Sequence, residues 1–375
     1  MTCAVAYQKM LGEVSPHCAI FPDMVYGRRG ELFDNCLRQD IDAIVWRPSH
    51  KSNAIILKRY TGLTRDADPV SLSDNSWTIL KDMRWLPSHR AVLRNELHSV
   101  YANSDWFSEC GTQFDKCMLT RDELIERLGL DPAKKTAVIF PHIVWDASMS
   151  RGKDLFADYQ EWLVHTVRAA CANTQVNWVI KIHPANVGKS LKDGYQGEPA
   201  EEIVLREHIG PLPSHVFLIK AQTDISTYSL LELMDYCVTV RGTTGIEAAS
   251  RGIPVITGGT GRYDRKGFTL DSDSQGEYLE KLATIQNISK LSEQQQELAE
   301  RYAFGLFLLR PLQLKTVTLE FAKEHGGKNN FTNARINART AADWHNAPDV
   351  RSLAEWFGDA HLTDFLIAPD LNENS

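Results

Sequence analysis

The sequence predicts an α/β protein whose parallel sheets are covered by helices on both faces. Three observations predict this doubly wound fold class. From Ala137 onward, short and almost wholly apolar strands alternate with helical segments, which is typical of a parallel sheet buried on both faces. These strands end in polar or glycine-containing turns. A chain of 375 residues is also long enough for two domains of ordinary size.

The regular part of the chain is predicted to contain five strands joined by helices. Each strand is a run of about four to five residues, mostly apolar, and the segments between them show helical spacing of apolar side chains. The predicted strands are 137–140, 178–182, 215–219, 236–240 and 254–257. The predicted helices are 156–172, 201–208, 226–235, 244–251, 277–285 and 293–307.

The N-terminal part is less regular and predicts a short second domain. Two strands are expected at 19–21 and 43–46 with a helix at 31–39 between them, and a further helix is expected at 121–128. We therefore predict two domains of the nucleotide-binding α/β type (Rossmann-like), of which the N-terminal one is short. Their predicted ranges are 1–130 and 131–325, followed by a linker and a helix at 326–375 that packs back on the body.

Composition excludes several classes of protein. A net charge of −7 argues against a nucleic-acid binder, because there is no basic surplus to neutralise phosphates. The seven cysteines form no C-x-x-C pair, which predicts reduced thiols in a cytoplasmic protein. The N-terminus lacks the apolar stretch of an export signal, and no run approaches the ~20 apolar residues of a membrane span. No metal-ligand pattern is visible, so we expect no metal site.

The segment 236–268 is the most informative for function. Its strand runs into the turn Arg241-Gly242-Thr243-Thr244, which opens a helix carrying Glu247. Backbone N–H groups at such a turn bind phosphate, and Glu247 would accept from ribose hydroxyls. This predicts a nucleotide or nucleotide-sugar site. Thr244 and Glu247 also fit a capping box, which would give both residues a purely structural role.

A glycine-rich loop follows the next strand at its carboxyl end. Gly259 and Thr260 would let the backbone approach a ligand closely, and Tyr263 would stack on a base or a sugar. The alternative is a surface loop with turn glycines.

Two histidines follow strands at the edge where open α/β sheets bind ligands. His183 precedes a proline that restricts its backbone, and with Lys181 it would bind a phosphate or a leaving-group oxygen. His142 and Asp146 follow the first strand and would act as acid, base or orienting group. The structural alternatives are a histidine that satisfies loop carbonyls and an aspartate that caps a helix.

Together these elements resemble bacterial capsule and surface polysaccharide biosynthesis proteins, which are glycosyltransferase-like enzymes of the two-domain GT-B architecture. The resemblance rests on AVIFPHIVWDA, NWVIKIHPAN, the run DISTYSLLELMDYCVTVRGTTGIEAASRGIPVI and GGTGRYDRKGF, and it covers roughly residues 100–310. Similar His-Pro elements occur in sialyltransferases and Kdo transferases, where the histidine contacts the phosphate of a CMP-sugar. The resemblance thus implies His183, Thr243, Thr244 and Glu247 at the donor.

We expect a cytoplasmic, metal-independent glycosyltransferase that uses a nucleotide-sugar as co-substrate and needs no cofactor. A CMP-linked sugar is one candidate donor, and the acceptor would be a glycan or glycolipid. Peripheral contact with the inner membrane or with the polysaccharide assembly machinery fits this reading. Two alternatives stay open: a nucleotide-sugar 2-epimerase, and an inactive subunit that only binds the nucleotide-sugar.

Overall fold

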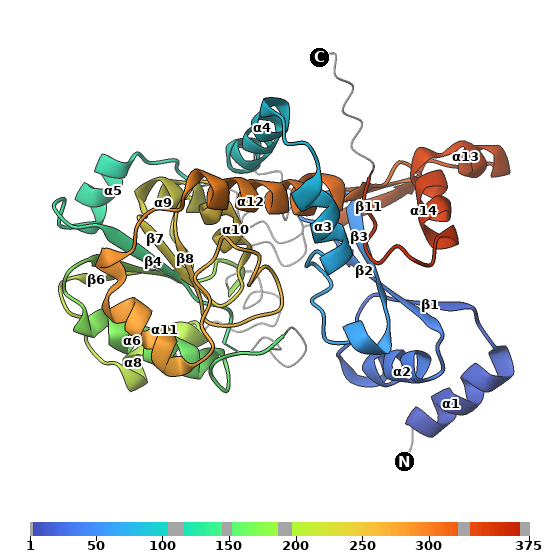
Figure 1. The fold of residues 1–375 in the computed structure, drawn as a ribbon, viewed down its shortest axis with the longest axis horizontal. Coiled ribbons are helices and arrows are strands. Elements are labelled where there is room, and N and C mark those ends of the chain that lie inside the picture. Colours follow the sequence, from blue (N-terminus) through green and yellow to red (C-terminus); the bar gives the residue numbers. More distant parts are fainter. Residues whose placement is uncertain (1–2, 104–115, 145–151, 187–196, 322–330, 368–375) are drawn as a thin grey trace. The chain divides into compact units, whose positions relative to one another are not determined.

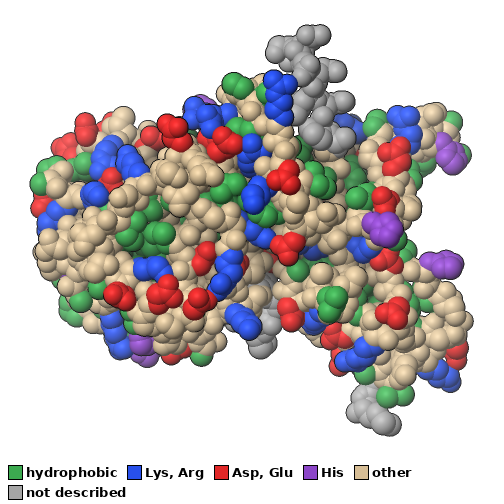
Figure 2. Space-filling model, viewed as in Figure 1, with side chains coloured by type: hydrophobic (Ala, Val, Ile, Leu, Met, Phe, Trp, Pro, Cys, Tyr) green, Lys and Arg blue, Asp and Glu red, His purple; other side chains and the backbone are tan. Residues whose placement is uncertain are grey.

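The computed structural model describes residues 3–103, 116–144, 152–186, 197–321 and 331–367. The chain divides into two compact units (Figure 1). The first consists of Met1–Arg84, Phe304–Glu320 and Asn333–Ser375, and the second of Trp85–Ala303 and Phe321–Thr332. The chain passes from one unit to the other at 84/85, 303/304, 320/321 and 332/333, whereas the sequence predicted boundaries at 130/131 and 325/326. Basic and acidic side chains are interspersed over the face shown in Figure 2.

The second unit is built on a five-stranded sheet in which every neighbouring pair is parallel. The strand order is β6-β5-β4-β7-β8. The strands are β4 (Thr136–Phe140), β5 (Asn177–Lys181), β6 (Val216–Ile219), β7 (Tyr236–Thr239) and β8 (Val255–Thr257). The α/β class is confirmed, and each strand lies within one residue of its predicted bounds.

Side chains on both faces of this sheet are buried, which is why its strands read as continuous apolar runs. In β5, Trp178, Val179 and Ile180 have no exposed surface although successive side chains point to opposite faces. Helices α6, α8 and α11 lie on one face, and α9 and α10 lie on the other (Figure 1). The bounds are α6 (Tyr159–Ala172), α8 (Ala200–His208), α9 (Thr227–Leu233), α10 (Thr243–Ala249) and α11 (Gln275–Ala283). Further α-helices of this unit, in the part of the chain that the structure describes, are α4 (Pro87–Asn103), α5 (Arg121–Leu128) and α12 (Glu293–Phe304).

Side-chain caps explain where several helices begin. The helix expected at 156–172 starts at Tyr159, because the Asp158 carboxylate accepts a hydrogen bond from the Glu161 N–H at 2.7 Å. Ser226 and Ser274 cap α9 and α11 in the same way. The chain beyond α12 continues as a π-helical turn over Gly305–Leu309 rather than as α-helix.

The first unit contains a four-stranded mixed sheet in the order β1-β2-β3-β9. The β1–β2 pair is parallel, while β3 is antiparallel to both β2 and β9. The strands are β1 (Cys18–Phe21), β2 (Asp42–Pro48), β3 (Ala54–Tyr60) and β9 (Leu312–Gln313), with α1 (Cys3–Val14), α2 (Gly27–Arg38) and α3 (Asp74–Asp82). The short N-terminal sheet is therefore not wholly parallel. The sequence did not predict β3, because Lys58 and Arg59 interrupt its apolar run although both are buried.

The C-terminal part of the chain completes this sheet. Beyond β9 come the strands β10 (Val317–Phe321) and β11 (Phe331–Ile336), which pair with each other, and the helices α13 (Ala341–Asn346) and α14 (Pro348–Gly358). Trp356 and Phe365 are buried against Ile44, Leu57 and Leu312. The amphipathic C-terminal segment thus packs on the N-terminal sheet.

A buried charge network connects the C-terminal segment to the N-terminal sheet. The Asp364 Oδ1 lies 3.5 Å from both the Lys58 Nζ and the Arg310 Nη2, and none of the three side chains is more than 1% exposed. Burial alone would raise the pKa of Asp364, but the charges of Lys58 and Arg310 outweigh it and lower that pKa to about 2. Arg310 also donates to the carbonyls of Val70 and Leu57. Every charge in the network therefore has an opposite charge or a hydrogen-bond partner.

Removing the single acid of this network should strongly destabilise the first unit. We expect Asp364→Ala to lower the free energy of unfolding by about 3–5 kcal/mol, since two buried cations would lose their counter-ion. Urea unfolding followed by tryptophan fluorescence measures this. Asp66→Ala removes an exposed carboxylate from the same unit and should leave the unfolding curve nearly unchanged. Equal curves for both variants would contradict the role given to Asp364.

Candidate functional site

The order of the strands creates a switch point between β4 and β7. The chain begins the sheet at β4, adds β5 and β6 on one side, and then crosses to place β7 and β8 on the other side. The connections that leave β4 and β7 therefore run in opposite directions, and ligands of open α/β sheets bind in the crevice at this point. Among the described residues, those that follow β4, β5, β7 and β8 at this carboxyl edge include His142, His183, Thr243 and Gly259.

His142 joins the two sides of the switch point. Its Nε2 accepts a hydrogen bond from the Arg241 N–H at 3.2 Å, and its ring stacks on that of Tyr159 with centroids 4.7 Å apart. A neutral ring that accepts at Nε2 carries its proton on Nδ1. Proton transfer through Nε2 would require this bond to break, so the geometry favours an orienting role. Its predicted partner Asp146 lies outside the described residues.

His183 lies just past the end of β5 and is exposed. Its Nδ1 accepts from the Ala185 N–H at 3.1 Å, so the neutral ring carries its proton on Nε2. An Nε2–H group is a suitable donor to a phosphate oxygen. The structure thus places a histidine donor at the edge predicted for the ligand.

Lys181 is the last residue of β5 and is only 4% exposed. Its Nζ donates to the Ile182 carbonyl at 2.8 Å, and no carboxylate in the described part of the chain pairs with it. Burial, with a smaller contribution from the Lys116 charge, lowers the pKa of Lys181 to about 7. A buried amine of this kind would gain its proton when an anion binds beside it.

Glu201 holds the segments after β4 and β5 together, and the sequence did not reveal it. This side chain in the first turn of α8 is completely buried. One carboxylate oxygen accepts from the Val144 N–H at 3.0 Å and the other from the Asn186 amide at 2.9 Å. In the sequence, Glu201 looks like an ordinary acid at a helix start, and no local signal marks its two partners.

Helix α10 begins in the turn after β7 and has no capping box. The capping role considered above for Thr244 and Glu247 is therefore wrong. The N-cap is Gly242, and Thr243 and Thr244 are the first two residues of the helix, so Glu247 lies beyond the first turn. Gly245 donates to the Gly242 carbonyl at 3.0 Å. Within the described ranges, the N–H groups of Thr243 and Thr244 have no acceptor. Both half-buried threonines therefore present backbone donors at the carboxyl edge.

Glu247 is buried beside α4 rather than turned to the ligand edge. Its Oε2 accepts from the Tyr101 hydroxyl at 2.6 Å. Burial raises the pKa of Glu247 to about 7, despite the opposing effects of this bond and of the Arg251 charge. The ribose contact expected for Glu247 is thus not supported, because its carboxylate is used by Tyr101. The partner lies 146 residues away, so sequence reasoning could not find it.

The glycine-rich loop covers a buried ion pair. Arg241 is 2% exposed and its guanidinium pairs with Asp154, which sequence reasoning missed. A Cβ at Gly259 would lie 2.6 Å from the Asp154 Oδ1 and 2.9 Å from the Arg241 Nη2. The Thr260 N–H donates to the Lys153 carbonyl at 2.8 Å, which fixes the loop beside this segment. Arg241 therefore supports the loop, and it would have to leave Asp154 to bind a ligand.

The structure corrects the role predicted for Tyr263. Its side chain is 1% exposed, and its hydroxyl donates to the Gly242 carbonyl at 2.7 Å. The ring lies among Phe268 and Tyr302 and is not available to stack on a base. Gly245 is required here, because a side chain at this position would collide with the tyrosine hydroxyl. Tyr263 thus holds the turn at the start of α10 from the buried side, through its bond to the Gly242 carbonyl.

Comparison with known proteins gives one family match. Residues 123–300 match the family described as capsule polysaccharide biosynthesis protein, which confirms the resemblance predicted from the sequence. No curated protein sequence matches the chain. None of the helices formed by the described residues combines the length and apolar character needed to cross a bilayer. Over the described ranges, no three His, Cys, Asp or Glu side chains meet in a way that suits a metal ion.

Several solved structures show limited similarity. One is KpsC from Thermosulfurimonas dismutans, beta Kdo 2,4 transferase, which is 14% identical over 76% of this chain and 78% of that chain, with a TM-score of 0.46. Another is KpsC from the same organism, beta Kdo 2,7 transferase, which is 14% identical over 87% of this chain and 86% of that chain, with a TM-score of 0.45. UDP-GlcNAc 2-epimerase from Neisseria meningitidis, bound to UDP-GlcNAc, is 12% identical over 81% of this chain and 76% of that chain, with a TM-score of 0.37. Similarities at this level carry no information on activity.

The raised pKa of Glu247 predicts a pH dependence of stability. Between pH 4.5 and about 7 the folded protein keeps this proton while the unfolded chain loses it, so the free energy of unfolding falls as pH rises through that window. Glu247→Gln keeps an acceptor for Tyr101 and removes the titration. We expect the stability of the wild type relative to this variant to fall by up to about 3 kcal/mol from pH 4.5 to 7. Chemical denaturation across this range measures it.

The control is Glu280→Gln, which replaces an exposed helical carboxylate in the same unit. A wild-type stability that stays constant relative to Glu247→Gln across the window would contradict the buried, protonated state of Glu247.

Proposed function

We propose that this chain, whose residues 123–300 belong to the capsule polysaccharide biosynthesis protein family, is a glycosyltransferase that moves a sugar from a nucleotide-sugar donor to a capsule or surface glycan. The observation that carries the proposal is the set of donors at the carboxyl edge beside the β4–β7 switch point. There Lys181 ends β5, His183 follows it, and the amides of Thr243 and Thr244 follow β7 of the same parallel sheet. We further propose a GT-B-type enzyme that works in the cytoplasm without a metal ion.

These donors suit the phosphate of a nucleotide-sugar. The His183 Nε2–H, the Lys181 ammonium and two backbone N–H groups supply both hydrogen bonds and positive charge at one edge. When the bond from the sugar to the phosphate breaks, negative charge develops on the departing phosphate oxygen. Donors that are already in place would stabilise this charge without reorganising.

The acid–base part of the reaction is assigned by elimination among the predicted residues. His142 uses its Nε2 to hold the Arg241 N–H, so we give it the task of orienting the two loops. Asp146, which follows it by four residues, is then the proposed base for the acceptor hydroxyl. Asp146→Asn should abolish transfer and leave donor affinity largely intact.

The donor assignment is tested by nucleotide binding. A thermal-shift screen of CMP, CDP, UDP and GDP should show one nucleotide that stabilises the fold by about 2.7 kcal/mol at a hundred times its dissociation constant. His183→Ala should weaken that nucleotide roughly tenfold to a hundredfold, because a charge-assisted hydrogen bond is lost. Isothermal titration calorimetry measures the affinities. His208→Ala, an exposed histidine at the end of α8, is the control and should bind normally.

Unchanged nucleotide affinity and turnover in His183→Ala would overturn the role of this histidine. Transfer itself is tested by incubating the matching nucleotide-sugar with and without a glycan acceptor. Release of nucleotide that depends on the acceptor supports the proposal, whereas conversion of the donor sugar to its epimer without an acceptor contradicts it.

The buried Lys181 provides a second and independent test. At pH 8 the amine, with its pKa near 7, is mostly neutral, and a phosphate bound beside it should raise that pKa. Nucleotide binding should then take up a fraction of a proton at pH 8 in the wild type, and less in Lys181→Met. Calorimetry in buffers of different ionisation enthalpy measures the difference. Equal proton uptake in both proteins would place Lys181 away from the phosphate.

A further inference from the structure

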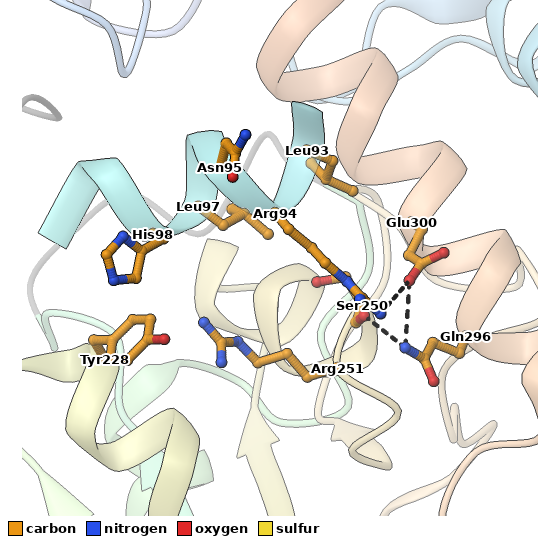
Figure 3. Close-up of a pocket in the computed structure, with 10 residues that line it drawn as sticks. All are labelled: Leu93, Arg94, Asn95, Leu97, His98, Tyr228, Ser250, Arg251, Gln296 and Glu300. Carbon is orange, nitrogen blue, oxygen red and sulfur yellow. Dashed lines mark hydrogen bonds and ion pairs between the residues drawn. The ribbon is translucent and has the colours of Figure 1, made fainter. Parts of the chain in front are cut away.

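A cavity of about 430 Å³ lies in the second unit, away from the proposed donor edge (Figure 3). Its walls come from α4, the start of α9, the chain just after α10, and α12. Ser250 and Arg251, which line it, follow the last turn of α10, whereas Thr243 opens that helix at the donor edge. Seven helical residues separate the two places by about 10 Å. The cavity is thus distinct from the proposed donor site.

The lining carries more positive than negative charge. Arg94 and Arg251 both face the cavity, and among the described residues that line it Glu300 is the only acid (Figure 3). The Glu300 carboxylate is already held by Arg90, which does not line the cavity, at 2.7 Å. Arg251 shares its charge with Glu232 and lies over the ring of Tyr228 at 4.6 Å. An anion that enters would therefore meet an excess of guanidinium charge.

Arg94 is the side chain that can bind such an anion. It is 66% exposed, and its nearest acid is Glu300 at 3.9 Å, beyond hydrogen-bond distance. In the described part of the chain its guanidinium has no hydrogen-bond acceptor. A planar group with five N–H donors binds a carboxylate or a phosphate through two parallel bonds. Arg94 thus offers a largely exposed guanidinium that makes one long ion pair with Glu300 (Figure 3), so most of its N–H donors can still bind an anion.

The rest of the lining suits a ligand whose remaining, uncharged part is small and polar. Leu93 and Leu97 of α4 are buried and form an apolar wall. Asn95 and His98 add groups that can bind hydroxyls, and His98 meets the edge of Tyr228 at 5.7 Å between ring centroids. The volume lies within the usual range of small-ligand sites, roughly 300–1,000 Å³. An apolar wall with hydroxyl-binding groups is the composition expected around a sugar ring.

We propose that this cavity is a second ligand site, which binds a sugar carrying a carboxylate or a phosphate through Arg94. The inference that the ligand is a sugar rests on the proposed function. The inference that it carries an anionic group rests on Arg94 alone. Arg251 raises the local positive potential, and His98 contacts the hydroxyls.

Binding of two acidic sugars to the full chain tests this site. Glucuronate and glucose 6-phosphate are the probes, with glucose as the uncharged control, and calorimetry or ligand-observed NMR gives the affinity. One or both acidic probes should bind the wild type, with an affinity that falls as salt is raised. Arg94→Gln should weaken binding roughly tenfold or more, and Arg94→Glu should abolish it. Which probe binds distinguishes the carboxylate from the phosphate.

Three controls keep the result specific. Arg206→Gln removes another exposed arginine of the same unit and should bind the probe normally. His183→Ala should also bind it normally, and Arg94→Gln should keep its nucleotide affinity, since the two sites are separate. Because Arg94 is exposed, its variants should show the melting temperature of the wild type, and that measurement confirms that they are folded.

The proposal is overturned if neither acidic sugar binds, if Arg94→Gln binds as tightly as the wild type, or if glucose binds equally well. These assays contain no donor, so they do not depend on transfer. Probe binding that is lost in Arg94→Gln, in a protein without transferase activity, would support this site and reject the proposed reaction. Transferase activity without probe binding would support the proposed reaction and reject this second site.

Discussion

The proposed site depends on one constraint of the fold: β4 is the first strand of its sheet in the sequence but the middle strand in space. The chain must therefore leave neighbouring strands in opposite directions, and something has to hold the diverging loops together. The bond from the Arg241 N–H to His142 does this between β4 and β7, and Glu201 does it between β4 and β5. These two connections help to fix the spacing of the groups that lie beyond the strands.

Burial shifts the pKa values of two ionisable groups of the second unit, Glu247 and Lys181, in opposite directions. It removes the charge that Glu247 would carry and weakens the charge that Lys181 would carry, so both groups have a pKa near 7. Their surroundings differ in one respect. Glu247 has a hydrogen-bond partner in Tyr101 and is satisfied within the fold, whereas Lys181 relies on a single carbonyl. Glu247 is therefore part of the packing, whereas Lys181 is the group that we propose to lie beside the donor phosphate.

The sequence predicted the parts of this protein that depend on local patterns. The five parallel strands were visible because both of their faces are buried, and the site edge followed from where they end. Contacts across the chain could not be predicted, since nothing near Glu247 or Arg241 points to Tyr101 or Asp154. Tyr263 was misjudged because a glycine-rich loop suggests exposure, while the ring is in fact packed inside. The mixed N-terminal sheet was missed because its charged strand is completed by residues more than 250 positions away.

The charged network around Arg310 also has a consequence for synthesis on the ribosome. Strand β9, Arg310 and Asp364 are all translated after Trp85–Ala303, the main part of the second unit, yet each is needed to finish the sheet that the N-terminal residues begin. Domains generally fold as units during elongation. Strands β1, β2 and β3 are therefore made long before their C-terminal partners, and Lys58 lacks its counter-ion until Asp364 has been synthesised.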